Sequence, residues 1–152
     1  MELSFEQSRM KTWATVLAYL HLGAGTSYLL LWSPLLKFCN YFQEQVLGGG
    51  PFWEPIGLPT ERFWFSLSIS MMYMLAFLAW ECSKDPVKNL GQMRTFIVSK
   101  AVSTVFFITF FFVDARAFAY IVGILVDGSL FALVLWLYTS TAASLEKKAA
   151  SS

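Results

Sequence analysis

The sequence predicts an all-α integral membrane protein, a four-transmembrane-helix up-down bundle with an extracytoplasmic amphipathic helix between spans 1 and 2. Two observations predict this class. Of the 152 residues, 57% are hydrophobic and only 14% are charged, which is too apolar a balance for an ordinary soluble domain. The chain also contains four apolar stretches, each reaching the roughly 20 residues that a helix needs to cross a bilayer core about 30 Å thick.

The four predicted spans cover residues of about 12–32, 63–82, 95–114 and 117–138. They form a single membrane domain, residues 1–142. The polar tail, residues 143–152, has too little apolar surface to fold alone, so disorder or a frayed helix end is expected there. Only a short link around Asp114 separates the last two spans, which are therefore expected to form a tight antiparallel hairpin.

The long link between the first two spans, residues 33–62, begins with an amphipathic segment. Its apolar residues recur at helical spacing while its charged residues fall elsewhere on the helical wheel. This pattern predicts an interfacial helix lying on the membrane surface. Three consecutive glycines at 48–50 end that helix. An irregular return path follows, with Pro51, Pro55 and Pro59.

The distribution of basic residues predicts the orientation of the chain. Seven of them share the side of the two termini, namely Arg9, Lys11, Lys84, Lys88, Arg94, Lys147 and Lys148. Three fall on the opposite side, namely Lys37, Arg62 and Arg116. Because cytoplasmic loops carry the excess of Lys and Arg, both termini are expected to be cytoplasmic.

Several classes of function find no support in the residues. The 11 basic and 10 acidic residues nearly balance, so no basic face for nucleic acid is expected. Cys39 and Cys82 are isolated from other metal ligands and are predicted to lie on opposite sides of the membrane, so neither a metal site nor a disulfide is expected. No nucleophile with an evident base, no phosphate loop and no paired carboxylates occur. We therefore predict no catalytic residue and no cofactor, and the sequence leans against an enzyme without deciding the point.

Ionisable residues inside the predicted spans are the strongest functional candidates, because such groups are costly in a bilayer unless they are paired or wetted. His21 and Asp127 are expected near the midplane, and Lys100 closer to the terminal side. Since their spans are neighbours, Lys100 and Asp127 are the natural ion pair, with Ser103 available as a hydrogen-bond partner. The alternative is that Lys100 snorkels to the head groups and leaves Asp127 protonated.

Helical spacing places further polar residues on inward faces, which gives an unusually polar bundle interior. The candidate ligand-binding or structural core comprises His21, Ser70, Tyr73, Lys100, Ser103, Tyr120 and Asp127. Such a core suits a proton relay, a ligand pocket or hydrogen-bonded contacts that hold the helices together.

The order of elements resembles small DoxX-like bacterial membrane proteins: a first span, an extracytoplasmic segment with Pro34, the RFW sequence at 62–64 and two closely linked spans. The stretches FWFSLSISMM, SKAVST and VDGSLF are also similar to uncharacterised four-span bacterial proteins. The resemblance implies the fold and a bacterial inner-membrane location. It also implies work beside another membrane component in a redox setting, and it carries over no catalytic residue.

These observations favour a small accessory or scaffold subunit that contacts the lipid bilayer and a membrane-protein partner or further copies of itself. Five phenylalanines of the third span are expected on its outer face, namely Phe106, Phe107, Phe110, Phe111 and Phe112. One alternative is a binding or redox-linked bundle, in which an apolar ligand such as a quinone or lipid meets His21 or Asp127. A proton-coupled transporter is the third possibility.

Overall fold

The computed structural model describes residues 3–50, 53–57 and 62–150, with the side chains of 62–64 left out, and this part of the chain forms helices without strands. The helices are α1 (Phe5–Gln45), α2 (Arg62–Lys84), α3 (Gln92–Val113) and α4 (Phe118–Ala150). Each described helix is long and apolar enough to cross a membrane. The predicted class, an all-α protein with four candidate membrane spans, is confirmed in this form.

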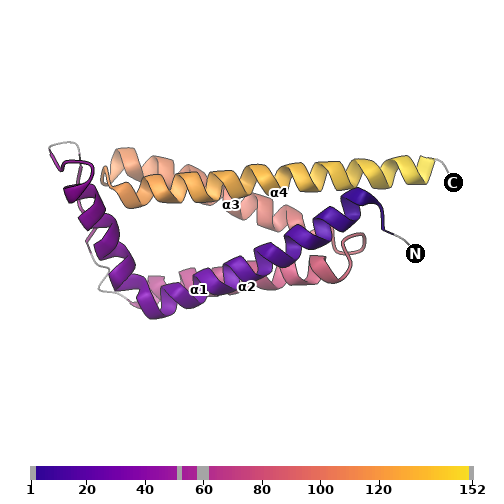
Figure 1. Cartoon of the computed structure of the whole chain (residues 1–152), viewed down its shortest axis with the longest axis horizontal. Coiled ribbons are helices and arrows are strands. Elements are labelled where there is room, and N and C mark those ends of the chain that lie inside the picture. Colours follow the sequence, from indigo (N-terminus) through magenta and orange to yellow (C-terminus); the bar gives the residue numbers. More distant parts are fainter. Residues whose placement is uncertain (1–2, 51–52, 58–61, 151–152) are drawn as a thin grey trace.

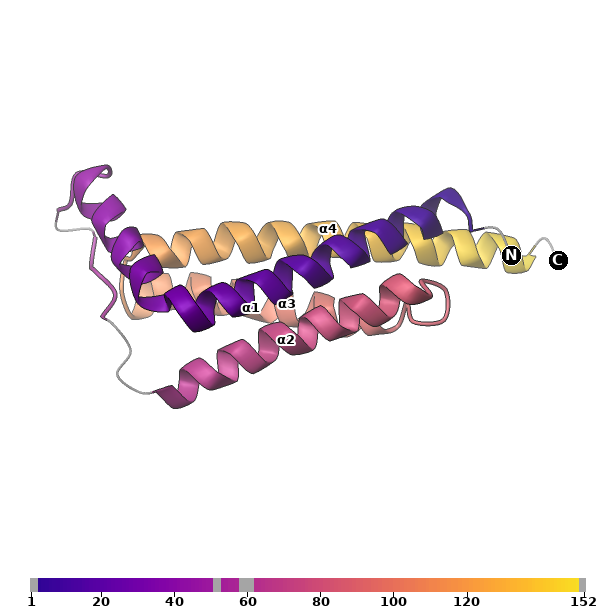
Figure 2. The same cartoon turned by 60° about the horizontal axis from the view of Figure 1, so that its bottom comes forward.

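The helices run lengthwise beside one another as two pairs (Figures 1 and 2). α1 packs mainly on α2, and α3 packs mainly on α4, while contacts of α1 with α4 and of α2 with α3 join the pairs. Both chain termini lie at the same end of the molecule as the connection between α2 and α3 (Figure 1). We call this end the terminal end and the opposite one the far end.

The packed core lies in the half of the molecule nearer the terminal end. Its buried apolar side chains come from all four helices and include Met10, Leu17, Leu75, Ala79, Met93, Phe96, Val134 and Leu137. Toward the far end the two helix pairs move apart (Figure 1). The tight packing that contributes most to the free energy of folding is therefore concentrated in the half of the bundle nearer the terminal end.

α1 is longer than the predicted first span because it continues through Pro34 as one helix of 41 residues. Figure 1 shows α1 bending sharply where its colour changes from indigo to magenta. Proline has no N–H to donate, and its ring clashes with the carbonyl four residues earlier, so it kinks a helix that it does not end. The segment for which the sequence predicts a separate amphipathic helix is instead continuous with α1, and we call the part beyond this bend the α1 arm (residues 35–45).

The α1 arm joins the two helix pairs at the far end (Figure 1). The Gln43 side chain is only 1% exposed, and its Oε1 accepts the backbone N–H of Phe118 at 2.8 Å. This bond satisfies an amide at the start of α4 that no earlier residue of that helix pairs. The rings of Phe42 and Phe118 stack with their centroids 4.8 Å apart. The arm is thus anchored to the second helix pair through both polar and aromatic contacts.

The predicted helix stop after the arm is confirmed. Gly48, Gly49 and Gly50 have φ angles of 85°, 49° and 137°, a region that residues with a Cβ rarely enter. The side chain of Asn40 then bonds the backbone N–H and C=O of Ile56, which holds the return path against the arm. Of the predicted prolines, Pro55 lies in the described segment, whereas Pro51 and Pro59 lie outside the described residues.

The expectation of a disordered or frayed tail is wrong for its described residues, 143–150, because α4 remains helical to Ala150. Leu145 packs against the core cluster, so the tail buries apolar surface on the other helices rather than standing alone. Lys147 and Lys148 in the last turn add favourable interaction with the negative end of the helix dipole.

Candidate functional site: a buried polar cluster at the edge of the core

An ion pair between α3 and α4 is the centre of the site. Lys100 Nζ lies 2.8 Å from Asp127 Oδ1, and the two side chains are only 11% and 13% exposed. Ser103 Oγ donates to the other carboxylate oxygen of Asp127 at 2.5 Å. The predicted pairing is therefore confirmed, and the alternative in which Lys100 snorkels to the head groups is wrong. Both carboxylate oxygens are satisfied by α3, so the cluster ties α3 to α4.

Helix geometry explains how two donors of α3 reach one carboxylate. Lys100 and Ser103 are three residues apart, which places them on the same helix face one turn from each other. Gly123 of α4 permits a close approach. A Cβ added there would lie 2.7 Å from the Phe107 ring, whereas one added to Gly128 would lie 3.6 Å from Thr104, an ordinary contact distance. Small residues of this kind let helix backbones approach closely in membranes.

His21 of α1 lies inside the bundle with 2% of its surface exposed. Its Nδ1 is 2.9 Å from the carbonyl oxygen of Leu17, so Nδ1 carries the proton and donates it to that carbonyl. Nε2 is then a hydrogen-bond acceptor, and this buried atom has no partner among the described residues. The ring packs edge-to-face on Phe96, with the two ring centroids 4.8 Å apart. The charges of Lys100 and Asp127 both act on the imidazole.

Of the other predicted core residues, one lies between α1 and α2 and two lie away from the ion pair. Tyr73 lies between α1 and α2, where its hydroxyl is 3.1 Å from that of Thr26. Ser70 is exposed and donates to the carbonyl of Ser66 in its own helix, so it does not face the interior. Tyr120 donates to Asp114 at 2.7 Å near the turn between α3 and α4, away from the ion pair. The structure therefore brings together His21, Lys100, Ser103 and Asp127, with Tyr73 in the neighbouring interface.

Arg9, which the sequence marks only as an indicator of orientation, joins α1 to α4. Its guanidinium donates to Ser140 Oγ at 2.8 Å and lies 4.1 Å from the centre of the Trp136 ring. Cation–π contacts and hydrogen bonds of this kind hold helix ends together. No local signal reveals this contact, because the partners are 131 residues apart in the chain.

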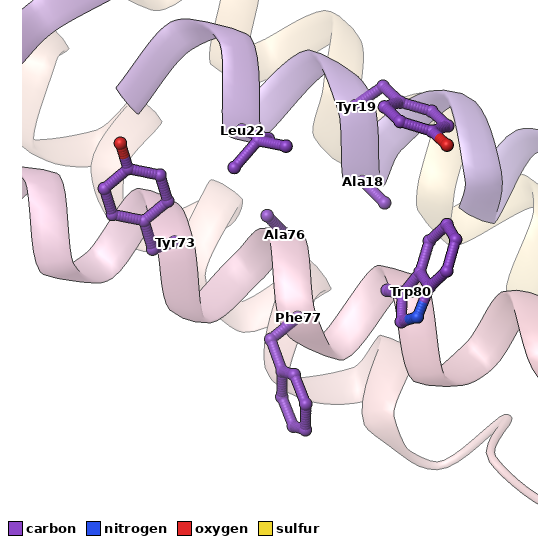
Figure 3. Close-up of a pocket in the computed structure, with 7 residues that line it drawn as sticks. All are labelled: Ala18, Tyr19, Leu22, Tyr73, Ala76, Phe77 and Trp80. Atoms are coloured by element: carbon purple, nitrogen blue, oxygen red, sulfur yellow. The ribbon is translucent and has the colours of Figure 1, made fainter. Parts of the chain in front are cut away.

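An apolar groove of about 360 Å³ lies between α1 and α2. Figure 3 shows Tyr73 and Trp80 toward its two ends, with the small side chains of Ala18 and Ala76 between them. Tyr19 packs edge-to-face on Trp80, with the ring centroids 6.0 Å apart. The groove is lined mainly by carbon atoms, and within a membrane span such a surface suits hydrocarbon.

The part of the chain that the structure describes holds no group of three His, Cys, Asp or Glu side chains able to bind a metal ion together. Cys39 and Cys82 are both free thiols. The chain is an all-helical integral membrane protein, because its described residues contain four candidate membrane spans. Comparisons with family models, with curated proteins and with solved structures find no match to this chain.

Replacing Asp127 by Asn should lower the free energy of unfolding by about 3–5 kcal/mol, because it leaves the Lys100 ammonium buried without a counter-charge. The double variant Lys100→Met/Asp127→Leu should recover much of that loss, because neither charge is then buried. Unfolding of the purified protein by titration of micelles with a denaturing detergent measures both changes.

The control is Glu81→Gln, which breaks the more exposed pair with Lys84 and should cost less than about 1 kcal/mol. A loss from Asp127→Asn no larger than that of the control would show that the ion pair does not hold the helices.

Proposed function

We propose that the chain is a small accessory or scaffold subunit of a membrane assembly, in which the polar cluster is structural and the outer surface of α3 binds a partner helix. The outer surface of α3 is the observation that carries this proposal. Five of its residues follow one another at alternating intervals of four and three: Val98, Val102, Val105, Thr109 and Phe112. We call this set the α3 outer face.

The α3 outer face is uncovered by the chain itself. Its valines and phenylalanine are between 47% and 72% exposed. The intervals of four and three place these side chains along one face of α3. This continuous apolar surface is large enough for a helix of a partner protein or of a second copy to pack along it.

The aromatic side chains of α3 divide between two surfaces. Phe106 and Phe110 are exposed and stack with their centroids 5.7 Å apart, as predicted for the outer surface. Phe107 instead packs on Gly123 of α4, and Phe111 contacts Trp53 with centroids 6.5 Å apart. The expectation that all five phenylalanines face outward is therefore wrong for these two. The reason is that their positions on α3 face α4 and the link before α2.

The buried cluster supports a structural role for its charges. Asp127 has both oxygens engaged by α3, so no carboxylate oxygen is left without a donor to act as a base. The similarity to DoxX-like proteins noted in the sequence favours the same proposal, because it implies work beside another membrane component.

We also propose that the protein lies in a bacterial inner membrane with its terminal end in the cytoplasm. The two termini and the connection between α2 and α3 share one end of the molecule (Figure 1). Seven of the ten basic residues assigned to the two sides of the membrane lie in the helix ends and the connection at this end. The positive-inside rule therefore favours this orientation.

A second candidate function is the binding of a small apolar ligand that carries a hydroxyl group, such as a quinol. His21 Nε2 favours it, because a buried acceptor without a partner costs free energy that a donor would recover. With the proton on Nδ1, this nitrogen can accept from a quinol hydroxyl but cannot donate to a quinone carbonyl.

The accessory role predicts that Val105→Trp releases the chain from its assembly, because a bulky ring at the centre of the α3 outer face blocks a partner helix. Leu30→Trp, at a site on α1 that is 70% exposed, is the matched control and should leave the assembly intact. Native mass spectrometry after mild-detergent extraction from the native membrane measures the mass of the complex. A wild-type chain that is always monomeric, or equal loss in both variants, would contradict the role.

The orientation predicts the behaviour of two reporter fusions. A fluorescent protein at the C-terminus should fluoresce, because that terminus is in the cytoplasm. Alkaline phosphatase inserted among the glycines at 48–50 should be active, because it requires an oxidising compartment outside the cytoplasm. The reverse pattern, measured in whole cells, would show that the chain is inserted the other way.

The ligand-binding candidate predicts that a short-chain quinol quenches tryptophan fluorescence at lower concentration than the corresponding quinone. His21→Phe should weaken quinol binding by about tenfold, which corresponds to the loss of one hydrogen bond from a buried group. Thr26→Val on the same helix should have no such effect. Equal quinol affinity in wild type and His21→Phe would rule out this role for Nε2.

A further inference from the structure

We propose that a cleft at the terminal end binds the head group of an anionic phospholipid from the leaflet on that side. The cleft has a volume of about 420 Å³ and lies between the N-terminal segment, the connection after α2 and the end of α4. Three lysines line it, Lys84, Lys88 and Lys148. Nothing in the accessory role requires such a site, so the two proposals stand or fall separately.

Charge complementarity identifies the ligand as an anion. Three lysines and one acidic residue, Asp85, line the cleft, and Glu81 contacts Lys84 beside it, so basic side chains outnumber acidic ones by three to two. Oδ1 of Asp85 accepts the backbone N–H groups of Val87 and Lys88 at 3.1 and 3.0 Å, which holds this carboxylate in the turn. Lys84 contacts Glu81 at 2.5 Å, yet an ammonium group has three donors and can serve a second oxygen.

The fold fixes the position of each lysine. Lys84 is the last residue of α2. Lys88 belongs to the connection held by the Asp85 turn and by Pro86, whose side chain is fully buried. Lys148 is carried on the last turns of α4, which Leu145 anchors to the core cluster. Three separate segments thus present ammonium groups to one volume, and their placement depends on packing rather than on a flexible tail.

The apolar part of the lining identifies the anion as a lipid rather than a dissolved ion. Leu3, Val87 and Leu145 line the same cleft, and Leu3 and Val87 are 41% and 43% exposed. The cleft lies where the apolar stretch of α2 gives way to charged residues, at the level expected for head groups. Basic pockets beside apolar helix surfaces at this depth hold phosphate groups while the acyl chains follow the helices.

The test is competition between two lipids that differ only in the head group. Protein in mild detergent is mixed with equal amounts of dioleoyl phosphatidylglycerol and dioleoyl phosphatidylcholine, and native mass spectrometry counts which lipid stays bound. We expect about tenfold preference for phosphatidylglycerol in the wild type, because each nearby lysine contributes about fivefold and part of this is screened. The triple variant Lys84→Gln/Lys88→Gln/Lys148→Gln should bind the two lipids about equally.

The control is Lys11→Gln/Lys37→Gln/Arg116→Gln, which removes the same charge outside the cleft and should keep the preference. Lys88→Gln alone, at an exposed side chain, should reduce the preference by about threefold and serves if the triple variant does not fold. An unchanged preference in the cleft variants, or equal loss in the control, would overturn the proposal. Displacement of phosphatidylglycerol by excess glycerol phosphate would also overturn it, because the ligand would then be a dissolved anion.

Discussion

The attraction between Lys100 and Asp127 constrains much of this molecule, because each charge is tolerated inside an apolar bundle only while the other stays beside it. At the distance of 2.8 Å the pair fixes the rotation and the axial position of α3 relative to α4. Glycine is then required at position 123, one helical turn before Asp127, since a Cβ there would collide with the Phe107 ring. The pair restricts the alignment of the two helices further than apolar contacts do, because only an alignment that keeps both charges together is tolerated inside the bundle.

The position of the pair along the bundle matters as much as its chemistry. On α3, the described buried residues run from Met93 to Lys100 and on α4 from Val134 to Thr141, all at or toward the terminal end. The ion pair and His21 therefore stand at the boundary between a tightly packed half and a half in which the helix pairs diverge. A polar cluster at such a boundary separates two parts of the protein that differ in packing and so in freedom to move.

Much of this arrangement follows from sequence patterns, because a bilayer imposes simple rules. The lengths of the apolar stretches predict the spans, and the cost of isolated charge in a bilayer predicts the Lys100–Asp127 pair. The glycines at 48–50 ended the arm as predicted, since a local backbone preference suffices there.

Features that depend on partners distant in the chain were not predictable in the same way. The contact between Arg9 and Ser140 and the burial of Gln43 have no local signature. Ser70 and Tyr120 share the spacing of inward residues, but their hydroxyls bond within their own neighbourhoods instead. The predicted first span ends near residue 32, whereas α1 continues through Pro34, because a proline can bend a helix that tertiary contacts hold beyond it.

The length of the α1 arm sets the distance between the two helix pairs at the far end. Its 11 residues, 35–45, form a helical segment about 16 Å long at about 1.5 Å per residue. The segment follows Pro34, and the hydrogen bond from Phe118 to Gln43 attaches it to α4. A single inserted residue would rotate Gln43 by about 100° away from Phe118, and only additions of whole turns would restore its direction. The arm can therefore lengthen only by whole helical turns, and each added turn would push the two helix pairs apart by about one helical pitch.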